Sequence, residues 1–174
     1  PCPFWDDNGD AWLVHAFAHS RSGIKHKLQL FAMSPDGTSL LGEGRIIYDG
    51  SCDQPTLEGP KVYKRGGWYY IFAPAGSVET GWETVLRASS MTGPWEARNV
   101  LFQGDTPVNG PHQGGWVGLD DGECWFVHFQ DAHLYGRIVH LQPMRWEQDG
   151  WPRIGEPMGD EGEGQPVMRW ARPT

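Results

Sequence analysis

Apolar and aromatic residues recur along the chain in short runs that are separated by turns rich in glycine, proline and aspartate. Hardly any segment has the 3.6-residue period of an amphipathic helix, so the pattern predicts strands along most of the chain. Three segments share a design in which a polar or glycine-containing turn leads into an aromatic strand: FWDDNGDAWLVHAFA, KVYKRGGWYYIFAPA and WVGLDDGECWFVHFQD. Their turns, DNG, RGG and DDG, are typical of tight hairpins with positive φ.

The spacing of these strands indicates an internal repeat. The aromatic strands begin at Trp12, Tyr69 and Trp125, which are 57 and 56 residues apart. Two further sets of predicted strands recur at a similar spacing along the sequence: Leu28, Val85 and Ile138, then Ile46, Val100 and Ile154. The connecting segments PTLEGPKVY and VNGPHQGGWV also echo one another. Each repeat therefore covers about 55 residues and holds four short strands.

Four short strands repeated at this interval predict an all-β fold made of propeller blades, each a four-stranded antiparallel sheet. The predicted blade-like units cover about residues 1–52, 53–106 and 107–158, and residues 159–174 begin a further strand. A propeller closes with roughly four to eight blades, so we expect an incomplete one that lacks at least one blade on its N-terminal side. The absence of a starting Met leads us to expect a chain cut at its ends. A β-sandwich with as many strands is the alternative.

The composition indicates a protein with a packed core and argues against certain classes of binding partner. The 24 glycines and 14 prolines would suit disorder, but 10 Trp, 5 Tyr and 7 Phe require burial or a flat ligand. The net charge of -8 argues against nucleic acid and anionic membrane surfaces as partners. Three widely spaced cysteines predict neither a zinc site nor a disulfide framework, and no apolar run reaches the roughly 20 residues of a membrane span.

Candidate site residues stand in the segments that lead into the predicted units or connect their strands. Propellers bind ligands near the central axis, where such segments converge. Glu58 lies in TLEGPK, Asn109 and His112 lie in VNGPHQGG, and Arg137 follows FQDAHLYG. A carboxylate, an imidazole and a guanidinium at equivalent ends of neighbouring units can converge on one small polar ligand.

Four segments resemble glycoside hydrolase family 43, and together the resemblance covers roughly residues 1–155: PCPFWDDNGDAWLVHAFAHSRSGIKHKLQL, PTLEGPKVYKRGGWYYIFAPAG, NGPHQGGWV and YGRIVHLQPMRW. It implies a five-bladed β-propeller that cleaves xylosides, arabinofuranosides or arabinans with inversion. It further implies that Glu58, in the EGP motif, is the general acid and that Arg137, in the GR motif, contacts the sugar. His112, in the GPH stretch, would lie under the active centre, where some members hold water around a calcium ion. No other cofactor is expected.

Two carboxylates of the family pattern have no counterpart in this sequence. The resemblance implies a general base, an Asp near the start of the first blade, and a third Asp directly before the position of Pro1. An inverting glycosidase needs one carboxylic acid to protonate the leaving oxygen and a second carboxylate, about 6.5–9.5 Å away, to activate water. We therefore expect an active parent protein and a very weak or inactive isolated chain.

Each candidate also has a structural alternative. Glu58 competes with nine other glutamates as an ordinary solvated turn residue. His112 suits a core histidine that is satisfied by backbone groups, and Arg137 suits an ion pair with Asp131.

The remaining aromatic, histidine and aspartate residues divide by position. Trp82, in the loop VETGWET, and Trp116, just past His112, are the candidates for stacking on a sugar ring. We expect the tryptophans at strand positions to pack inside the fold: Trp12, Trp68, Trp125, Trp146 and Trp151. Histidines without convergent spacing are expected to be structural: His15, His19, His26, His128, His133 and His140. Aspartates in hairpin turns are expected to serve the turn and not catalysis: Asp6, Asp7, Asp120 and Asp121.

The predicted function is a glycosidase of β-xylosidase or α-L-arabinofuranosidase type that acts on plant polysaccharides and oligosaccharides. The sequence does not separate the two sugars, because their hydroxyl groups are arranged alike. A non-catalytic carbohydrate-binding propeller is the second hypothesis, and an Asp base in a preceding blade would discriminate between them. A WD40 or Kelch scaffold is disfavoured, since the repeat lacks their signatures and exceeds the roughly 45 residues of a WD40 blade. The compartment and the oligomeric state stay open, although open strand edges and inter-blade faces predict association and poor stability of the isolated chain.

Overall fold

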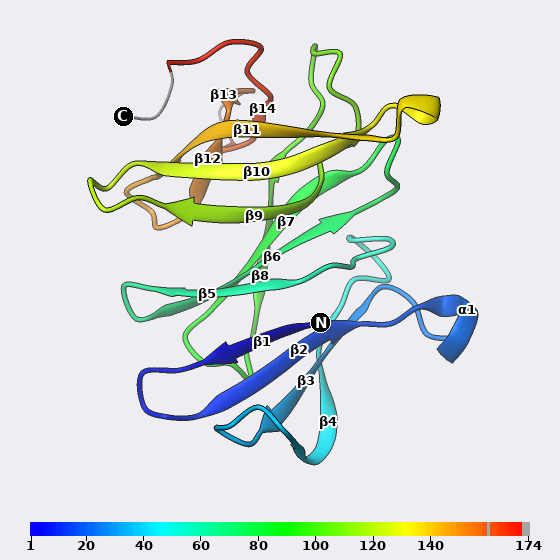
Figure 1. Cartoon of the computed structure of the whole chain (residues 1–174), viewed down its shortest axis with the longest axis vertical. Coiled ribbons are helices and arrows are strands. Elements are labelled where there is room, and N and C mark those ends of the chain that lie inside the picture. The colour runs from blue at the N-terminus through cyan, green and yellow to red at the C-terminus, as the bar shows by residue number, and fades with distance from the viewer. Residues whose placement is uncertain (160, 172–174) are drawn as a thin grey trace. The chain divides into compact units, whose positions relative to one another are not determined.

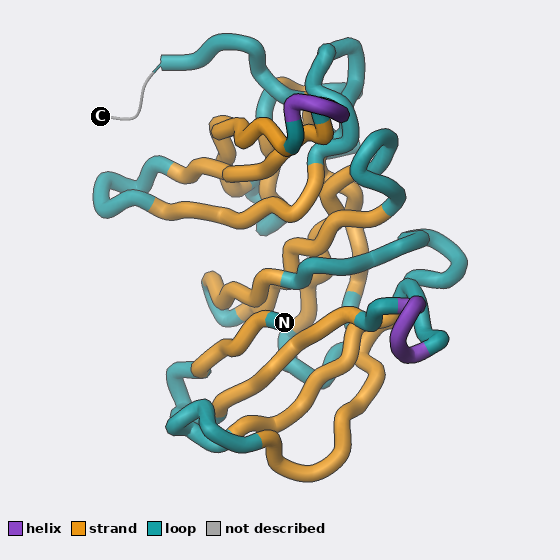
Figure 2. Tube along the Cα trace, turned by 45° about the vertical axis from the view of Figure 1, so that its right-hand side comes forward, coloured by secondary structure: helices purple, strands orange, loops and turns teal. Residues whose placement is uncertain are grey.

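The computed structural model describes residues 1–159 and 161–171. Strands dominate it, and two short helical turns lie in connections between strands (Figure 1, Figure 2). The helical turns are α1 (His19–Ser22) and η1 (His133–Tyr135). The strands are β1 (Cys2–Trp5), β2 (Ala11–Ala16), β3 (Lys27–Met33), β4 (Leu40–Asp49), β5 (Lys61–Arg65), β6 (Trp68–Ala75), β7 (Trp82–Ala88), β8 (Glu96–Leu101), β9 (His112–Gly118), β10 (Cys124–Asp131), β11 (Arg137–Trp146), β12 (Pro152–Ile154), β13 (Glu156–Pro157) and β14 (Gly164–Gln165).

Consecutive strands are neighbours in three sheets. Strands β1 to β4 form one sheet in sequence order, and β9 to β12 form another. Strands β5 to β8 are also neighbours in order, in a sheet that β14 and β13 extend beyond β8. The all-β class predicted from the sequence is confirmed, with sheets of four to six strands. The division into propeller blades stays a prediction.

The chain forms two compact units. The first holds residues 1–75 and 85–98, and the second holds residues 76–84 and 99–174 as far as they are described. Strands β7 and β8 have residues in both units.

In the first unit, strand β6 carries the sequence WYYIFAPA, which is rich in the aromatic and β-branched residues that favour strands. Its residues from Tyr70 to Ala75 are buried on both faces of the sheet. The hairpin before it turns at Gly66 and Gly67, with φ of 58° and 81°. The predicted tight hairpin with positive φ is thereby confirmed at this turn.

Strands β1 and β5 lie beside each other in the first unit, so the sheets that contain them are linked. The Val62 N–H donates a hydrogen bond to Cys2 Sγ at 3.3 Å. The Lys64 ammonium pairs with Asp6 in the β1–β2 turn and lies 3.1 Å from the Asp7 carboxylate. The first strands of these two sheets are therefore held together by a hydrogen bond and by ion pairs.

In the second unit, strands β9, β10 and β11 pack around fully buried Phe126. Gly114 on β9 lies against this ring, since a Cβ at that position would stand 1.8 Å from Phe126 Cζ. The close approach of β9 to this ring requires glycine at position 114. Strand β9 thereby has a fixed position directly after the segment that contains Asn109 and His112.

Candidate active site

Glu58 lies in the connection between β4 and β5, three residues before β5 begins. Its N–H donates a hydrogen bond to the Pro74 carbonyl at 3.1 Å, which ties the EGP segment to the end of β6. The preceding Leu57 is 2% exposed and anchors the segment in the core, while Glu58 itself is half-buried. Lys61 Nζ donates to the Gly59 carbonyl at 3.1 Å. The glutamate therefore stands on a segment fixed at both sides, as a positioned acid requires.

His112 is the first residue of β9 and is 1% exposed. It pairs in register with Phe129 of β10, and the two ring centroids are 5.9 Å apart. The chain reaches His112 through Gly110, which has a φ of +45°, and a Cβ there would stand 2.3 Å from the Val78 carbonyl oxygen. Only glycine fits this close passage. His112 is thus held deep in the second unit, with the burial of a core side chain.

Arg137 begins β11 and is exposed. It lies opposite Asp131 in the β10–β11 ladder, yet its guanidinium carbon stands 4.6 Å from the centre of the Phe129 ring. No ion pair between Arg137 and Asp131 is found in the described part of the chain. The structure therefore places His112 and Arg137 against the same aromatic side chain. Sequence reasoning missed Phe129, and its only signal was the conspicuous FQD run that ends β10.

The two tryptophans proposed as sugar platforms both contact other aromatic rings. Trp82 is the first residue of β7 and not a loop residue, because the strand begins earlier than the sequence indicates, and its ring lies 5.9 Å from Phe102. Trp116 lies within β9 and packs edge-to-face on Trp146 at 5.0 Å. This geometry favours a packing role for Trp116 within its sheet.

A chain of polar contacts crosses the second unit next to these residues. Asn109 Nδ2 donates to the Glu79 carbonyl at 3.4 Å, and its Oδ1 accepts from Gln130 Nε2 at 3.0 Å. Gln130 Oε1 lies 2.7 Å from His140 Nε2, and the His140 ring stacks on His128 at 5.4 Å. The segment that leads to His112 is therefore tied to β10 and β11, and to the connection that precedes β7.

Burial governs the ionisation of the two histidines in this chain of contacts. Burial lowers the pKa of His128 to about 4. The hydrogen bond with the Phe129 carbonyl raises this pKa, but its effect is smaller than that of burial. Burial also lowers the pKa of His140 below its ordinary value. Both rings are therefore neutral near pH 7, which agrees with the structural role expected for them.

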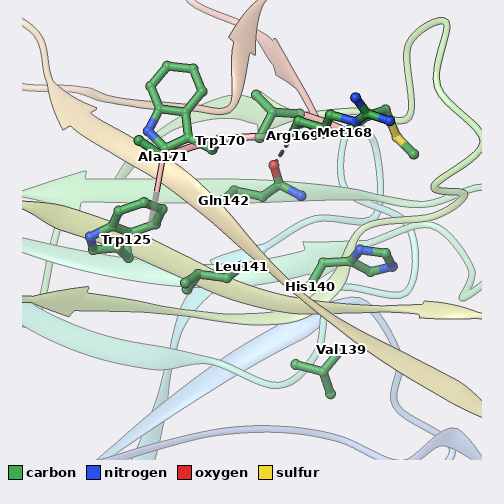
Figure 3. A pocket seen from close by; sticks show the side chains of 10 residues that line it. Trp125, Val139, His140, Leu141, Gln142, Met168, Arg169, Trp170 and Ala171 are labelled. Atoms are coloured by element: carbon green, nitrogen blue, oxygen red, sulfur yellow. Dashed lines mark hydrogen bonds between the residues drawn. The ribbon is translucent and has the colours of Figure 1, made fainter. Parts of the chain in front are cut away.

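A pocket of about 340 Å³ opens over β10 and β11, and His140 of the chain of polar contacts is among the residues that line it (Figure 3). Trp125, Leu141 and Gln142 line it together with residues 167–171, and the Gln142 Oε1 accepts a hydrogen bond from the Val167 N–H at 2.7 Å. None of the predicted site residues lines this pocket.

The predicted site residues fall in different units. Glu58 belongs to the first unit, whereas the other candidates belong to the second: Trp82, His112, Trp116 and Arg137. Within the second unit, the structure brings His112 and Arg137 together at Phe129 and keeps both tryptophans in aromatic packing. Among the described residues, no helix is long and apolar enough to cross a membrane.

Comparison with known proteins identifies the class to which this β-sheet architecture and its EGP and GR segments belong. The family model for glycosyl hydrolases family 43 matches residues 1–152. The crystal structure of xylan beta-1,4-xylosidase from Bacillus halodurans C-125 has a TM-score of 0.75 and 28% identity, over 95% of this chain and 33% of that one. The chain belongs to glycoside hydrolase family 43, as its sequence motifs predicted.

Two relatives match almost the whole chain. The protein named "Putative beta-xylosidase" from Xylanibacter ruminicola is 50% identical over 174 residues, which are 100% of this chain and 32% of the relative. The "Beta-xylosidase" of Formosa agariphila is 30% identical over 198 residues, covering 99% of this chain and 33% of its own length. The chain thus spans about a third of the length of these relatives.

Proposed function

We propose that the protein to which these residues belong is a glycoside hydrolase of β-xylosidase or α-L-arabinofuranosidase type. Its substrates are xylose- or arabinose-containing plant polysaccharides and oligosaccharides. The observation that carries the proposal is the 50% identity along the whole chain to a protein named "Putative beta-xylosidase", together with the presence of Glu58 in the EGP segment of this chain. A relative from Bacteroides ovatus is named as a non-reducing end alpha-L-arabinofuranosidase and is 32% identical over 114 residues. This relative supports including arabinofuranosides beside xylosides among the proposed substrates.

In the proposed mechanism, the Glu58 carboxylic acid gives its proton to the leaving glycosidic oxygen. A second carboxylate takes a proton from a water that attacks the anomeric carbon on the opposite face, so that the product has inverted configuration. The proposal assigns that base to an Asp that these 174 residues do not contain, so the isolated chain has little or no activity. A partial five-bladed propeller is the architecture that goes with this proposal.

Sugar contacts are proposed for Arg137, His112, Trp82 and Trp116. Arg137 is the best supported, because its guanidinium is exposed and is positioned by the Phe129 ring. His112 is buried behind the same ring, so its contribution is to support this surface or to hold water. Trp82 and Trp116 are weaker candidates because each ring already packs on an aromatic neighbour.

The resemblance implies a calcium ion that is held near His112 through water. Calcium takes six to eight oxygen ligands, and an imidazole is not one of its preferred ligands. Among the described residues, the group of side chains able to hold a metal does not include His112. His112 is therefore not proposed as a direct calcium ligand; a calcium ion held near it through water stays a proposal, and the proposed mechanism contains no metal step.

The test compares the full-length parent protein with its Glu58→Gln variant on two substrates of each sugar. Aryl glycosides of 4-nitrophenol have a good leaving group, whereas xylobiose and arabinobiose need protonation of a poor one. Loss of a general acid should slow the disaccharides by about 10²–10⁴-fold and the aryl glycosides much less. Glu43→Gln, an exposed residue of β4, is the matched control and should retain full activity.

Two results would contradict the assignment. If Glu58→Gln lost the same fraction of activity on aryl glycosides and on disaccharides, Glu58 would not be the general acid. Turnover by the isolated chain would show that the general base lies within these 174 residues. A parent that binds xylo-oligosaccharides without hydrolysing them would instead favour the carbohydrate-binding alternative. The product configuration, followed by NMR, tests inversion separately.

A further inference from the structure

Three side chains of metal-binding type converge in the second unit, apart from the residues assigned to the glycosidase. They are Glu79, Asp131 and His133, and their ligand atoms all lie within 4.8 Å of one another. Glu79 lies in the connection between β6 and β7, whereas Asp131 ends β10 and His133 begins the helical turn η1. The set therefore joins two connections that are about 50 residues apart in the sequence.

The backbone around these residues is fixed by hydrogen bonds. The Glu79 carbonyl accepts from Asn109 Nδ2, and Asn109 in turn accepts from Gln130, the residue directly before Asp131. The η1 turn is closed by hydrogen bonds from Tyr135 N–H to the Ala132 carbonyl and from the Gly136 N–H to the His133 carbonyl. The two connections are thus tied to each other by contacts that leave the three side chains free to bind.

The three side chains have no protein partner in the described part of the chain. A cation bound between the two carboxylates would offset their mutual repulsion, which solvent already weakens at these accessible positions. In residues 1–159 and 161–171, no hydrogen bond or ion pair satisfies the side chains of Glu79, Asp131 or His133. The guanidinium of Arg137 lies over Phe129 instead of pairing with Asp131.

We propose that Glu79, Asp131 and His133 form a binding site for a divalent transition-metal ion, with Zn²⁺ as the preferred occupant. One imidazole nitrogen and two carboxylate oxygens are a ligand set that Zn²⁺ accepts, and three protein ligands leave a position for water. Calcium is disfavoured because it requires more oxygen ligands than this group offers. Two ligands are exposed and one is half-buried, so the ion can enter from solvent. The proposal does not depend on the glycosidase assignment.

The test is a titration of the metal-free protein, prepared with EDTA, with Co²⁺ as a spectroscopic substitute for Zn²⁺. We expect one Co²⁺ per chain, displaced by Zn²⁺, with visible ligand-field bands of a nitrogen and oxygen site. Asp131→Asn and His133→Gln should each weaken binding at least about tenfold, because loss of even a side chain that supports a metal ligand costs about 10–100-fold in affinity. His19→Gln and Glu43→Gln change a histidine and an acidic residue at exposed positions elsewhere and should bind as the wild type does.

Melting of each protein in EDTA checks that the variants fold, and Zn²⁺ should raise the melting temperature of the wild type more than that of Asp131→Asn or His133→Gln. Unchanged Co²⁺ affinity in these two variants would overturn the proposal. A thiolate-to-cobalt charge-transfer band that disappears in Cys52→Ser would also overturn it, because the exposed Cys52 would then be the ligand. Displacement of Co²⁺ by an equal concentration of Ca²⁺ would refute the assignment to transition metals.

Discussion

The Asp6 carboxylate is a centre of polar contacts between the β1–β2 turn and strands β5 and β6. Its side chain is 2% exposed and accepts hydrogen bonds from Lys64 Nζ, from the Tyr69 hydroxyl and from the Asp7 N–H. Burial raises the pKa of Asp6, but these hydrogen bonds together outweigh it and leave the pKa below the ordinary 3.8. The ionised form is therefore favoured by folding.

Asp6→Asn should lower the free energy of unfolding by about 2 kcal/mol at pH 7, because hydrogen bonds to a charged group are lost. The folded pKa lies below the unfolded value, so this stabilisation is complete above about pH 4 and is lost as the pH falls through the folded pKa. Urea unfolding at pH 7 and pH 3 measures both effects. Asp7→Asn, at an exposed residue that also pairs with Lys64, should cost less than about 1 kcal/mol. Equal losses in the two variants would contradict the burial argument.

At the scale of elements, β10 and β11 fix the segment that follows β14 through His128 and Gln142. The Gln142 Oε1 accepts from the Val167 N–H, so its Nε2 is oriented as a donor toward His128 Nε2, 3.1 Å away. His128 must then carry its proton on Nδ1, which lies 3.3 Å from the Phe129 carbonyl. Protonation of Nε2 would set two donors against each other, in agreement with the depressed pKa of about 4.

This arrangement predicts a loss of stability in mild acid. The folded His128 pKa of about 4 lies below the unfolded value of 6.5, so the unfolded chain binds more protons between these values. The free energy of unfolding should fall by up to about 3 kcal/mol from pH 6.5 to pH 4. Melting of wild type and His128→Asn across this range measures it, with His19→Asn as the control. A slope that persists unchanged in His128→Asn would exclude this ring as its source.

At the scale of the whole molecule, the sheet of β9 to β12 has an apolar face that is open to solvent. Val127 and Leu141 are partners in the β10–β11 ladder, and Val139 lies two residues from Leu141 on the same face. These three side chains are 37%, 45% and 69% exposed for Val127, Leu141 and Val139. Val139 and Leu141 also line the pocket of Figure 3. Such a face favours association.

We expect the isolated chain to self-associate at tens of micromolar, on the order of weak apolar interfaces. Replacing Val139 and Leu141 together by Lys should yield monomers without lowering the melting temperature, since both side chains are exposed. Sedimentation velocity over a range of concentrations tests this, with Leu40→Lys as a control at an exposed position of β4. A wild-type chain that stays monomeric throughout would disprove the expected association.

Local features could be predicted from the sequence because they depend on neighbouring residues. The strands around Trp12, Tyr69 and Trp125, and the hairpin at Gly66 and Gly67, follow from alternation and turn chemistry. The family followed from short contiguous motifs such as EGP. The start of β7 was misjudged at Trp82, because the flanking sequence VETGWET gives no sharp boundary between turn and strand.

The sequence by itself therefore determined the all-β class, the family and the positions of most strands. Only the tertiary structure decided that His112 and Arg137 share Phe129, that Asp6 pairs with Lys64, and that two distant connections bring together the residues of the proposed metal site. The physical reason is the range of the interactions. Hydrogen bonding within strands and turns is encoded over a few residues, whereas contacts between residues tens of positions apart depend on how the sheets pack.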